Sequence, residues 1–210
     1  MPTRIYRITH IENLATILDQ GGMWCGNETL ARDLPFKSIG NTDLTSSRHQ
    51  RVVRCAASGT LNDYVPFYFC PRSVMLYLIS KRHQSTYGGG QEPIIYFVSS
   101  VESIASRGIP FAFTDRNAFI RTARYSDDLD ELGDLPDWEV IESGEWASTD
   151  HDPDRKERKQ AEFLVHNYVP LDCVKGIAVY SERYRKEVAE QLQAYKMTLP
   201  IQIKTSWYYN

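Results

Sequence analysis

The segment Ala161-Glu-Phe-Leu-Val-His-Asn-Tyr-Val-Pro170 is the most informative part of this chain. Its apolar residues alternate as in a β-strand, so that Phe163, Val165 and Val169 point to one face. Glu162 stands at the mouth of this strand. A carboxylate among apolar side chains costs free energy unless it has a partner or a chemical role. The segment therefore predicts a buried strand that presents one functional carboxylate.

Elements on both sides of this strand predict an α+β fold. Residues 4–9 are short and β-branched enough for a strand, and Thr9 with Glu12 forms a capping box for a helix that ends before Gly21. A second capping box, Ser99 with Glu102, precedes a short helix. Residues 1–210 contain no repeat or linker and are expected to form one domain. Further strands are predicted at 63–70, 94–99, 176–180 and 201–204, and further helices at 74–79 and 181–195.

Two features of these elements have more than one interpretation. A strand that runs directly into a capped helix leaves backbone N–H groups near Thr9 free to face a phosphate or a ribose oxygen, or it is a plain connection. The aromatic strand with Tyr64, Phe67 and Tyr68 can stack on a nicotinamide ring or a base, or it can pack a core. The residue pattern leaves both questions open.

The charge balance excludes several classes of protein. The 210 residues include 24 basic and 27 acidic side chains, a formal charge of −3, and 42% are hydrophobic. This composition supports a folded core and excludes disorder, fibres and the coating of nucleic acid by bulk positive charge. No apolar run is long enough to span a membrane, and the first ten residues lack an apolar signal core. We therefore expect a soluble, cytoplasmic protein.

The residues that could bind a metal do not form a recognisable site. Cys25, Cys55, Cys70 and Cys173 are widely spaced, and no C-x-x-C or histidine pattern completes a zinc motif. The acidic cluster at 127–134 lacks the ligand spacing of a cation site and is interpreted as a solvated face. We expect four reduced thiols and no bound metal.

Two basic clusters stand out from the acidic average. Arg48, Arg51 and Arg54 recur every three residues, which would place them on one side of a helical turn. This patch either binds an anion or is a solvated helix face. The segment 155–159 has four basic residues and one acid, a local charge of +3, at the end of a polar stretch that begins at 114. Long polar stretches with embedded aromatic residues are often binding loops.

Five sequence blocks occur in an order that is typical of one protein family. They are 6–14 (YRITHIENL), 63–77 (DYVPFYFCPRSVMLY), 89–93 (GGQEP), 113–116 (FTDR) and 159–165 (KQAEFLV). With the closing Trp207-Tyr-Tyr209 they extend over nearly the full chain. These blocks resemble the DarT toxins, which are the DNA ADP-ribosyltransferases of the DarT/DarG toxin–antitoxin systems.

This resemblance implies a fold, a reaction and a partner. The fold would be of the ADP-ribosyltransferase type, with two packed β-sheets and surrounding helices that form a cleft for NAD. The reaction would use NAD as co-substrate, attach ADP-ribose to a base of single-stranded DNA, thymine in the branch that this chain resembles, and release nicotinamide. The partner would be a DarG-type macrodomain antitoxin that reverses the modification. Neither a metal nor a membrane is implied.

The resemblance also assigns the catalytic residues. Glu162 occupies the position of the family's catalytic glutamate, and a carboxylate there can stabilise the positive charge that develops when the nicotinamide bond breaks. The family's essential arginine falls on Arg48, with Arg51 as the competing position. A guanidinium stays protonated, so its expected role is electrostatic. The proton that thymine loses would then pass to Glu162 or to solvent.

Further residues are expected to contact the two substrates. Arg7-Ile8-Thr9 stands where the family has His-Ile-Thr, and Asn117 stands where some relatives have histidine. Trp24 would cover a ring of NAD by stacking, or it is a core aromatic. The expected NAD contacts are Arg7, Ile8, Thr9, Thr16, Trp24, Arg48 and Tyr68. The expected DNA contacts are Arg51, Arg54, Arg116, Asn117, Arg155, Lys156, Arg158 and Lys159.

Other functions remain open at this point. Guanine in DNA, a protein target, or plain hydrolysis of NAD would use the same NAD pocket and the same Glu162. A catalytically silent module that binds single strands is a further alternative. An intact Glu162 argues against the silent module, because a pure binding protein has no use for that carboxylate.

Overall fold

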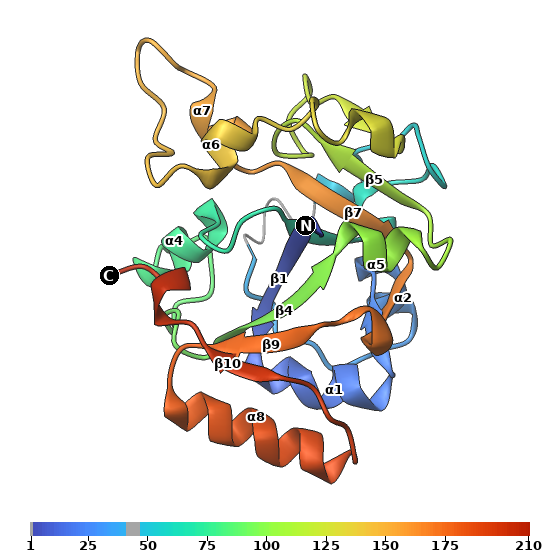
Figure 1. Cartoon of the computed structure of the whole chain (residues 1–210), viewed down its shortest axis with the longest axis vertical. Coiled ribbons are helices and arrows are strands. Elements are labelled where there is room, and N and C mark those ends of the chain that lie inside the picture. The colour runs from blue at the N-terminus through green and yellow to red at the C-terminus, as the bar shows by residue number, and fades with distance from the viewer. Residues whose placement is uncertain (1, 41–46) are drawn as a thin grey trace.

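The computed structural model describes residues 2–40 and 47–210, and it confirms the α+β class (Figure 1). Within these residues, eight strands form one hydrogen-bonded sheet in the order β10-β9-β4-β1-β3-β7-β5-β6, and β2 pairs with β8 in a second, small sheet. The strands are β1 (Arg4–His10), β2 (Gly22–Trp24), β3 (Tyr64–Tyr68), β4 (Ile94–Ser100), β5 (Phe111–Thr114), β6 (Tyr125–Ser126), β7 (Glu162–His166), β8 (Tyr168–Pro170), β9 (Gly176–Val179) and β10 (Ile201–Ile203).

The large sheet consists of two halves that meet at a narrow junction. Strands β1 and β4 pair from Arg4 with Ser100 to His10 with Ile94, and β3 pairs with β7 along its whole length. Between these halves, β1 and β3 are joined through the pair of Tyr6 with Tyr68. One half is therefore β10-β9-β4-β1 and the other is β3-β7-β5-β6. A narrow junction allows the halves to diverge on either side of it.

Helices cover the two ends of the molecule. In Figure 1, α8 runs along one end beside β9 and β10, with α1 next to it, whereas α6 and α7 lie at the opposite end beyond β7. The helices are α1 (Leu14–Asp19), α2 (Gly26–Ala31), α4 (Val74–Ser80), α5 (Val101–Ala105), α6 (Trp138–Glu142), α7 (Arg155–Arg158) and α8 (Glu182–Ala194). Short 3-10 turns are formed by Ile11–Asn13, Leu61–Asp63, Leu129–Glu131, Leu171–Cys173 and Thr205–Trp207.

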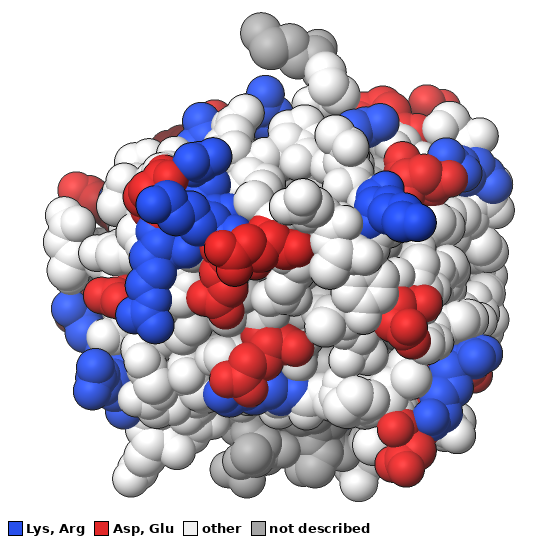
Figure 2. All heavy atoms as spheres, turned by 90° about the horizontal axis from the view of Figure 1, so that it is seen from below, with Lys and Arg blue, Asp and Glu red and all other residues white. Residues whose placement is uncertain are grey.

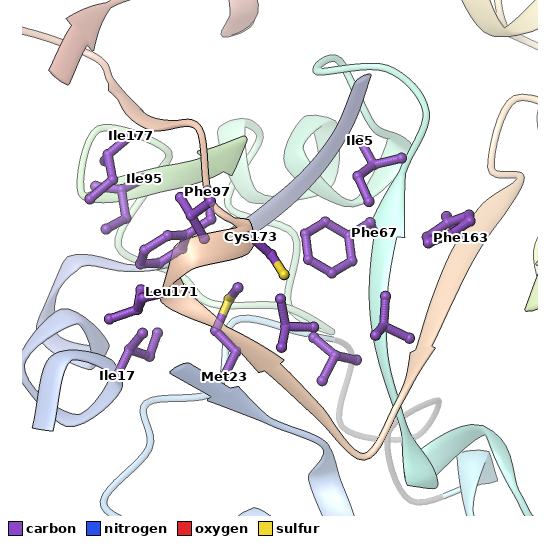
Figure 3. Close-up of a cluster of buried hydrophobic side chains, with 14 of the residues drawn as sticks. Ile5, Ile17, Met23, Phe67, Ile95, Phe97, Phe163, Leu171, Cys173 and Ile177 are labelled. Atoms are coloured by element: carbon purple, nitrogen blue, oxygen red, sulfur yellow. The ribbon is translucent and has the colours of Figure 1, made fainter. Parts of the chain in front are cut away.

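The main core lies between the sheet and these helices (Figure 3). Phe67 and Phe163 face each other across β3 and β7, and both are fully buried. Phe97 of β4 belongs to the same cluster. Burial of each such ring stabilises the fold by roughly 1.5–3 kcal/mol. The strand that carries Glu162 is therefore anchored in the core.

At both predicted capping boxes the side-chain cap lies one residue later. His10 caps the 3-10 turn Ile11–Asn13 that leads into α1, and its Nδ1 accepts the N–H of Glu12 at 3.2 Å, while the Thr9 hydroxyl accepts a hydrogen bond from Asn13 at 2.8 Å. Ser100, and not Ser99, caps α5. The capping-box prediction was wrong because β1 and β4 each continue one residue further than the pattern indicates.

The predicted strand from Glu162 to Val169 is interrupted at Asn167. This residue has a φ of +62°, a left-handed conformation that asparagine tolerates better than most residues. As a result β7 ends at His166, and β8 leaves the large sheet to pair with β2. The backbone carbonyl of Asn167 accepts the N–H of Cys25 at 2.7 Å, which fixes the start of α2 beside this break.

Three further observations concern the cysteines, the helices and the surface charge. All four cysteines are free thiols. Within residues 2–40 and 47–210, no helix is long and apolar enough to cross a bilayer. On the face at the α8 end, basic and acidic side chains are interspersed, as Figure 2 shows. This mixture agrees with the weak net charge and shows no single-sign field on that face.

Candidate active site

A cavity of about 460 Å³ opens beside the junction of the two half-sheets. Its volume lies within the range of about 300–1,000 Å³ that is usual for small-molecule sites. Its charged end is formed by Arg7, Arg48 and Glu162, and its apolar lining residues include Leu30, Leu34 and Phe36. The remaining lining residues are Ile8, Trp24, Gly26, Thr29, Asp33, Ser38, Ile39, Gly40, His49, Asn62, Tyr64, Pro66, Tyr68 and Met75.

Glu162 is the buried carboxylate of this cavity. It is the first residue of β7, pairs with Tyr68 of β3, and is 3% exposed. Its Oε1 accepts the backbone N–H of Ala118 at 3.1 Å, and its Oε2 faces Arg48. Its own backbone N–H donates to the Thr114 hydroxyl at 3.0 Å. Strand β7, the neighbouring strand β5 and a loop thus hold the carboxylate in one orientation.

Arg48 completes the charged end of the cavity. Its two terminal nitrogens donate to Oε2 of Glu162 at 3.3 and 3.2 Å. Arg51 turns away from the carboxylate, and its Nη2 donates to the carbonyls of Ile120 and Arg121 at 2.8 and 3.1 Å. The structure therefore brings Arg48, and not Arg51, to the predicted catalytic carboxylate.

The expected helical face of Arg48, Arg51 and Arg54 is wrong. Arg48 is the last residue of its helical turn, and residues 49–54 are not helical. The three side chains therefore do not share one helix face, although Arg51 and Arg54 line a common hollow.

Arg7 and Tyr68 lie on neighbouring strands beside this pair. The Arg7 guanidinium donates to the Pro66 carbonyl at 3.1 Å. Burial, and then the nearby Arg48, lower the pKa of Arg7 to about 10, so the guanidinium stays charged at neutral pH. Burial, and then the Glu162 carboxylate, raise the pKa of Tyr68, so its hydroxyl stays neutral and can donate. Two cations and one hydroxyl thus line the same cavity as the buried carboxylate.

Trp24 lines the cavity but has neighbours on its ring. Its ring packs against Tyr168 with 4.3 Å between centroids, and the Arg32 guanidinium lies 3.8 Å from the ring centroid. The indole N–H donates to Gln20 at 3.3 Å. Stacking of a ligand ring on the face that carries Arg32 would therefore require Arg32 to move.

The other residues that we expected to contact NAD divide into two groups. Ile8 lines the cavity, whereas Thr9 is buried and engaged with Asn13. Thr16 lies in a neighbouring hollow of about 30 Å³, and its hydroxyl donates to the Pro35 carbonyl at 3.2 Å. The structure thus brings five of the seven expected residues into the cavity, namely Arg7, Ile8, Trp24, Arg48 and Tyr68.

The three predicted aromatic residues of β3 have different surroundings. Phe67 belongs to the core, and Tyr64 is buried with its hydroxyl donating to the Ser58 carbonyl at 2.8 Å. Tyr64 and Tyr68 also line the cavity. Alternate residues of a strand face opposite sides, which accounts for this division.

Sequence reasoning missed a polar wall of the cavity. Asn62 donates to the side chain of Asn27 at 2.7 Å, and its Nδ2 lies 3.4 Å from Nε2 of His49. Gly26 packs so closely that a Cβ there would lie 2.4 Å from Oδ1 of Asn62. The sequence held no signal for this wall, because three separate segments build it.

The basic segment 155–159 is largely neutralised by ion pairs. Arg155 pairs with Asp152 at 3.1 Å, and Arg158 pairs with Asp137, Asp152 and Asp154. Lys159 is 4% exposed and donates to the carbonyls of Ile141 and Ser143. Lys156 is exposed and forms no ion pair with any residue that the structure describes.

Arg116 and Asn117 are also tied into the fold. Arg116 pairs with Asp115 at 3.2 Å, Asp154 at 3.1 Å and Glu157 at 3.5 Å. The Asn117 backbone N–H donates to the Glu157 carbonyl at 2.9 Å. These contacts fix the loop that carries Ala118, the residue after Asn117, whose N–H donates to the Glu162 carboxylate. The expected DNA contacts in this region thus include several residues that shape the site itself.

The acidic cluster and the possible metal ligands can now be placed in the structure. The acidic residues at 127–134 are exposed, as expected of a solvated face. Among residues 2–40 and 47–210 there is no group of histidine, cysteine or carboxylate side chains suited to hold a metal ion.

Comparisons with known proteins agree with this geometry. The profile of the family described as "ssDNA thymidine ADP-ribosyltransferase, DarT" matches residues 6–209. The chain is 42% identical to the DNA ADP-ribosyl transferase of Thermus sp. (strain 2.9), over 99% of this chain and 97% of that protein. It is 34% identical to the DNA ADP-ribosyl transferase of Escherichia coli O127:H6, over 98% of this chain and 93% of that protein.

Solved structures show the same fold. The structure of Thermus sp. 2.9 DarT with ADP-ribosylated single-stranded DNA matches with a TM-score of 0.92, at 41% identity, over 99% of this chain and 97% of that chain. The same protein with NAD+ matches with a TM-score of 0.87, over 99% and 98%. The predicted ADP-ribosyltransferase type of fold is confirmed. The chain therefore belongs to the DarT family of single-stranded DNA thymidine ADP-ribosyltransferases.

Proposed function

We propose that this chain transfers ADP-ribose from NAD to the base of a thymidine in single-stranded DNA, with Glu162 and Arg48 as its catalytic residues. The pairing of these two side chains at the charged end of a ligand-sized cavity is the observation that carries the proposal. Membership of the DarT family supports the reaction, and it favours thymine over guanine as the target.

The lining of the cavity fits NAD as co-substrate. A dinucleotide needs cations for its diphosphate, a carboxylate near the reacting ribose and apolar walls for its rings. Arg7 and Arg48 supply the cations, Glu162 supplies the carboxylate, and Leu30, Leu34 and Phe36 supply apolar wall. These residues would hold NAD, which supplies the ADP-ribosyl group when it is bound.

Glu162 stabilises the positive charge that develops on the ribose as the nicotinamide bond breaks. A charge-stabilising group acts best when it is already oriented, because then no reorganisation is needed during the reaction. The N–H of Ala118 and the two nitrogens of Arg48 provide that orientation, since they fix both oxygens of the carboxylate. Glu162 is well placed for this role because water has little access to it.

Arg48 acts through its charge. A guanidinium does not lose its proton in proteins, so Arg48 cannot serve as a base. It orients Glu162, and it lowers the free energy of a thymine base that is losing its proton. That proton passes to the Glu162 carboxylate or to solvent.

The family context supports a partner and a compartment. A DarG-type macrodomain antitoxin would reverse the modification, as the sequence resemblance implies. The substrates are DNA and NAD, which supports action in the cytoplasm. Both statements are proposals that follow from the proposed reaction.

One experiment separates this proposal from its alternatives. The protein is incubated with NAD and a single strand that contains one thymine, and in parallel with strands in which cytosine or guanine replaces that thymine. Mass spectrometry should detect one added ADP-ribose on the thymine strand. A shift on the guanine strand alone would assign guanine as the target. Consumption of NAD without any modified strand would favour hydrolysis of NAD or a protein target, and an absence of both activities would favour a silent binding module.

A further inference from the structure

A second cavity, of about 610 Å³, lies between two segments that both lead to the active site. One segment runs from Gln50 to Cys55, shortly after Arg48, and the other runs from Arg121 to Tyr125, shortly after Ala118. The full lining consists of Gln50, Arg51, Val52, Arg54, Cys55, Arg121, Ala123 and Tyr125. Three arginines and no acid thus line this hollow.

Hydrogen bonds fix the walls of this cavity to each other. The Arg51 guanidinium donates hydrogen bonds to the carbonyls of Ile120 and Arg121 in the second segment. It also lies 6.0 Å from the centroid of the Tyr125 ring. The Tyr125 hydroxyl donates to the Ala118 carbonyl. Because the Ala118 N–H holds Glu162, the cavity and the catalytic carboxylate are built on the same loop.

The arginines of this cavity lack the ion pairs that neutralise segment 155–159. Arg54 and Arg121 are exposed, and none of the three pairs with a carboxylate among the residues that the structure describes. Nε of Arg51 is buried and has no hydrogen-bond partner, so it lies out of reach of an anion in the hollow. The exposed guanidinium groups of Arg54 and Arg121 are the donors that an anionic oxygen can reach, and such charge-assisted hydrogen bonds are strong. The cavity therefore has the donors of an anion site.

Two neighbouring groups limit what else this cavity can do. Asp127 lies near its rim, where it accepts the N–H of Ala56 at 2.7 Å. Burial, and then the charge of Asp127, raise the pKa of the Cys55 thiol, so this cysteine stays protonated at neutral pH. A protonated thiol is a poor nucleophile. Binding through the arginines is thus a better explanation of the cavity than covalent chemistry.

We propose that this cavity binds backbone phosphates of the single strand next to the target nucleotide, with Arg54 and Arg121 as the ligands and Arg51 as the residue that holds the two walls together. This inference rests on the proposed action on DNA. The strand phosphates are preferred over the NAD diphosphate because Arg7 and Arg48 already provide cations in the first cavity. The strand would then run over segments 50–55 and 121–125, and not over the ion-paired segment 155–159.

Salt dependence provides the first test. Each phosphate neutralised on a single strand contributes a slope of about −0.7 to the logarithm of affinity against the logarithm of salt concentration. We would measure KM for a thymine strand between about 50 and 300 mM NaCl with the double variant Arg54→Gln/Arg121→Gln. We expect KM to rise about tenfold or more, and the slope to become shallower by about 1.4, the sum of two contacts.

Two matched variants control for charge. Arg107→Gln removes an exposed arginine that pairs with Asp172 at 2.8 Å, and it should leave KM and the slope unchanged. Lys156→Gln removes the exposed lysine of segment 155–159. If Lys156→Gln flattens the slope and the double variant does not, the strand runs over 155–159 and the proposal is wrong. A raised KM for NAD in the double variant would assign the cavity to the diphosphate and would also overturn the proposal.

A neutral backbone tests the same contact from the DNA side. A methylphosphonate in place of the phosphate next to the target thymine should lower kcat/KM for the wild-type protein about fivefold or more. It should have little further effect in the double variant, because the contact is already lost. Equal effects in both proteins would contradict the inference. If the wild-type protein modified no strand at all, the proposed function would fail, which is a different outcome.

Discussion

Arg48 and Glu162 are separated by 114 positions in the sequence, and both terminal nitrogens of Arg48 donate to one oxygen of Glu162. The other oxygen accepts the N–H of Ala118. The arginine side chain is 19% exposed and the glutamate side chain 4%, so the pair lies largely out of water. Loss of one partner leaves the other charge poorly compensated, which is more costly than loss of a surface pair. The pair is therefore a sensitive point for both activity and stability.

Substitution of Arg48 should cost far more activity than substitution of Arg51. Arg48→Lys keeps the charge but loses the two-nitrogen contact with Glu162, and we expect kcat to fall about 100-fold or more. Arg51→Lys loosens the loop at Ile120 and Arg121 and should lower kcat by about tenfold or less. Single-turnover transfer at saturating NAD and DNA measures both. The reverse order would make Arg51 the essential arginine.

The Thr114 hydroxyl should be needed to position Glu162. Thr114→Val keeps the shape but leaves the Glu162 backbone N–H without its acceptor at 3.0 Å. Because this region is buried, we expect the free energy of unfolding to fall by about 1–3 kcal/mol, together with kcat. Thr114→Ser restores a hydroxyl and should recover most of the activity. Denaturant unfolding and transfer rates provide the measurements, and full activity in Thr114→Val would contradict this role.

Gly26 should be sensitive to a single added methyl group. In Gly26→Ala, the Cβ would meet the Asn62 side chain at 2.4 Å, so the polar wall of the NAD cavity must shift. We expect a higher KM for NAD and a lower Tm. Gly133→Ala is the matched control, because nothing lies within 4 Å of a Cβ there. If Gly26→Ala has the same KM for NAD and the same Tm as the wild type and Gly133→Ala, the prediction is wrong.

The stability of the fold should depend on pH through Asp63, which accepts a hydrogen bond from Asn27 of the polar wall. Burial alone would raise the pKa of Asp63, but hydrogen bonds from Thr60 and Asn27 outweigh it and lower the pKa below the usual value. A lowered pKa in the folded protein stabilises it above the unfolded-state pKa, and this contribution is lost as the pH falls through the folded-state pKa. Asp63→Asn should therefore be less stable than wild type at pH 7, and the difference should shrink below about pH 4. A constant difference across this range, measured by denaturant unfolding, would contradict the assignment.

The sequence predicted the elements better than it predicted their ends. The strand with Glu162 and the helix at 181–195 follow from strong apolar patterns, because burial selects one face. The caps shifted to His10 and Ser100 because strand pairing, which is non-local, extends β1 and β4 by one residue. The break at Asn167 depends on a left-handed backbone that several residue types avoid but asparagine tolerates. Its position was therefore not visible in the alternation of side chains.

The site was predictable in its residue types and less so in its contacts. The resemblance placed Glu162 and Arg48 together, but the sequence alone could not, since their contact depends on how distant segments fold together. The surroundings of the basic segment 155–159 were not predictable for a related reason. Arg158 pairs with Asp137, Asp152 and Asp154, and only the folded loop brings those acids to it. A local charge sum cannot show which cations remain available to a ligand.

The measurement that tests the central claim most directly compares the mass of a one-thymine strand after reaction with the wild-type protein and with Glu162→Gln. Glutamine keeps the shape of the side chain and removes its charge. We predict one added ADP-ribose with the wild type and a rate lower by about 100-fold or more with Glu162→Gln. We also predict a lower Tm for Glu162→Gln, because Arg48 loses its charged partner, with the variant still folded at the assay temperature. Transfer by Glu162→Gln at close to the wild-type rate would contradict the assignment of Glu162, and an unmodified strand with the wild type would contradict the proposed function.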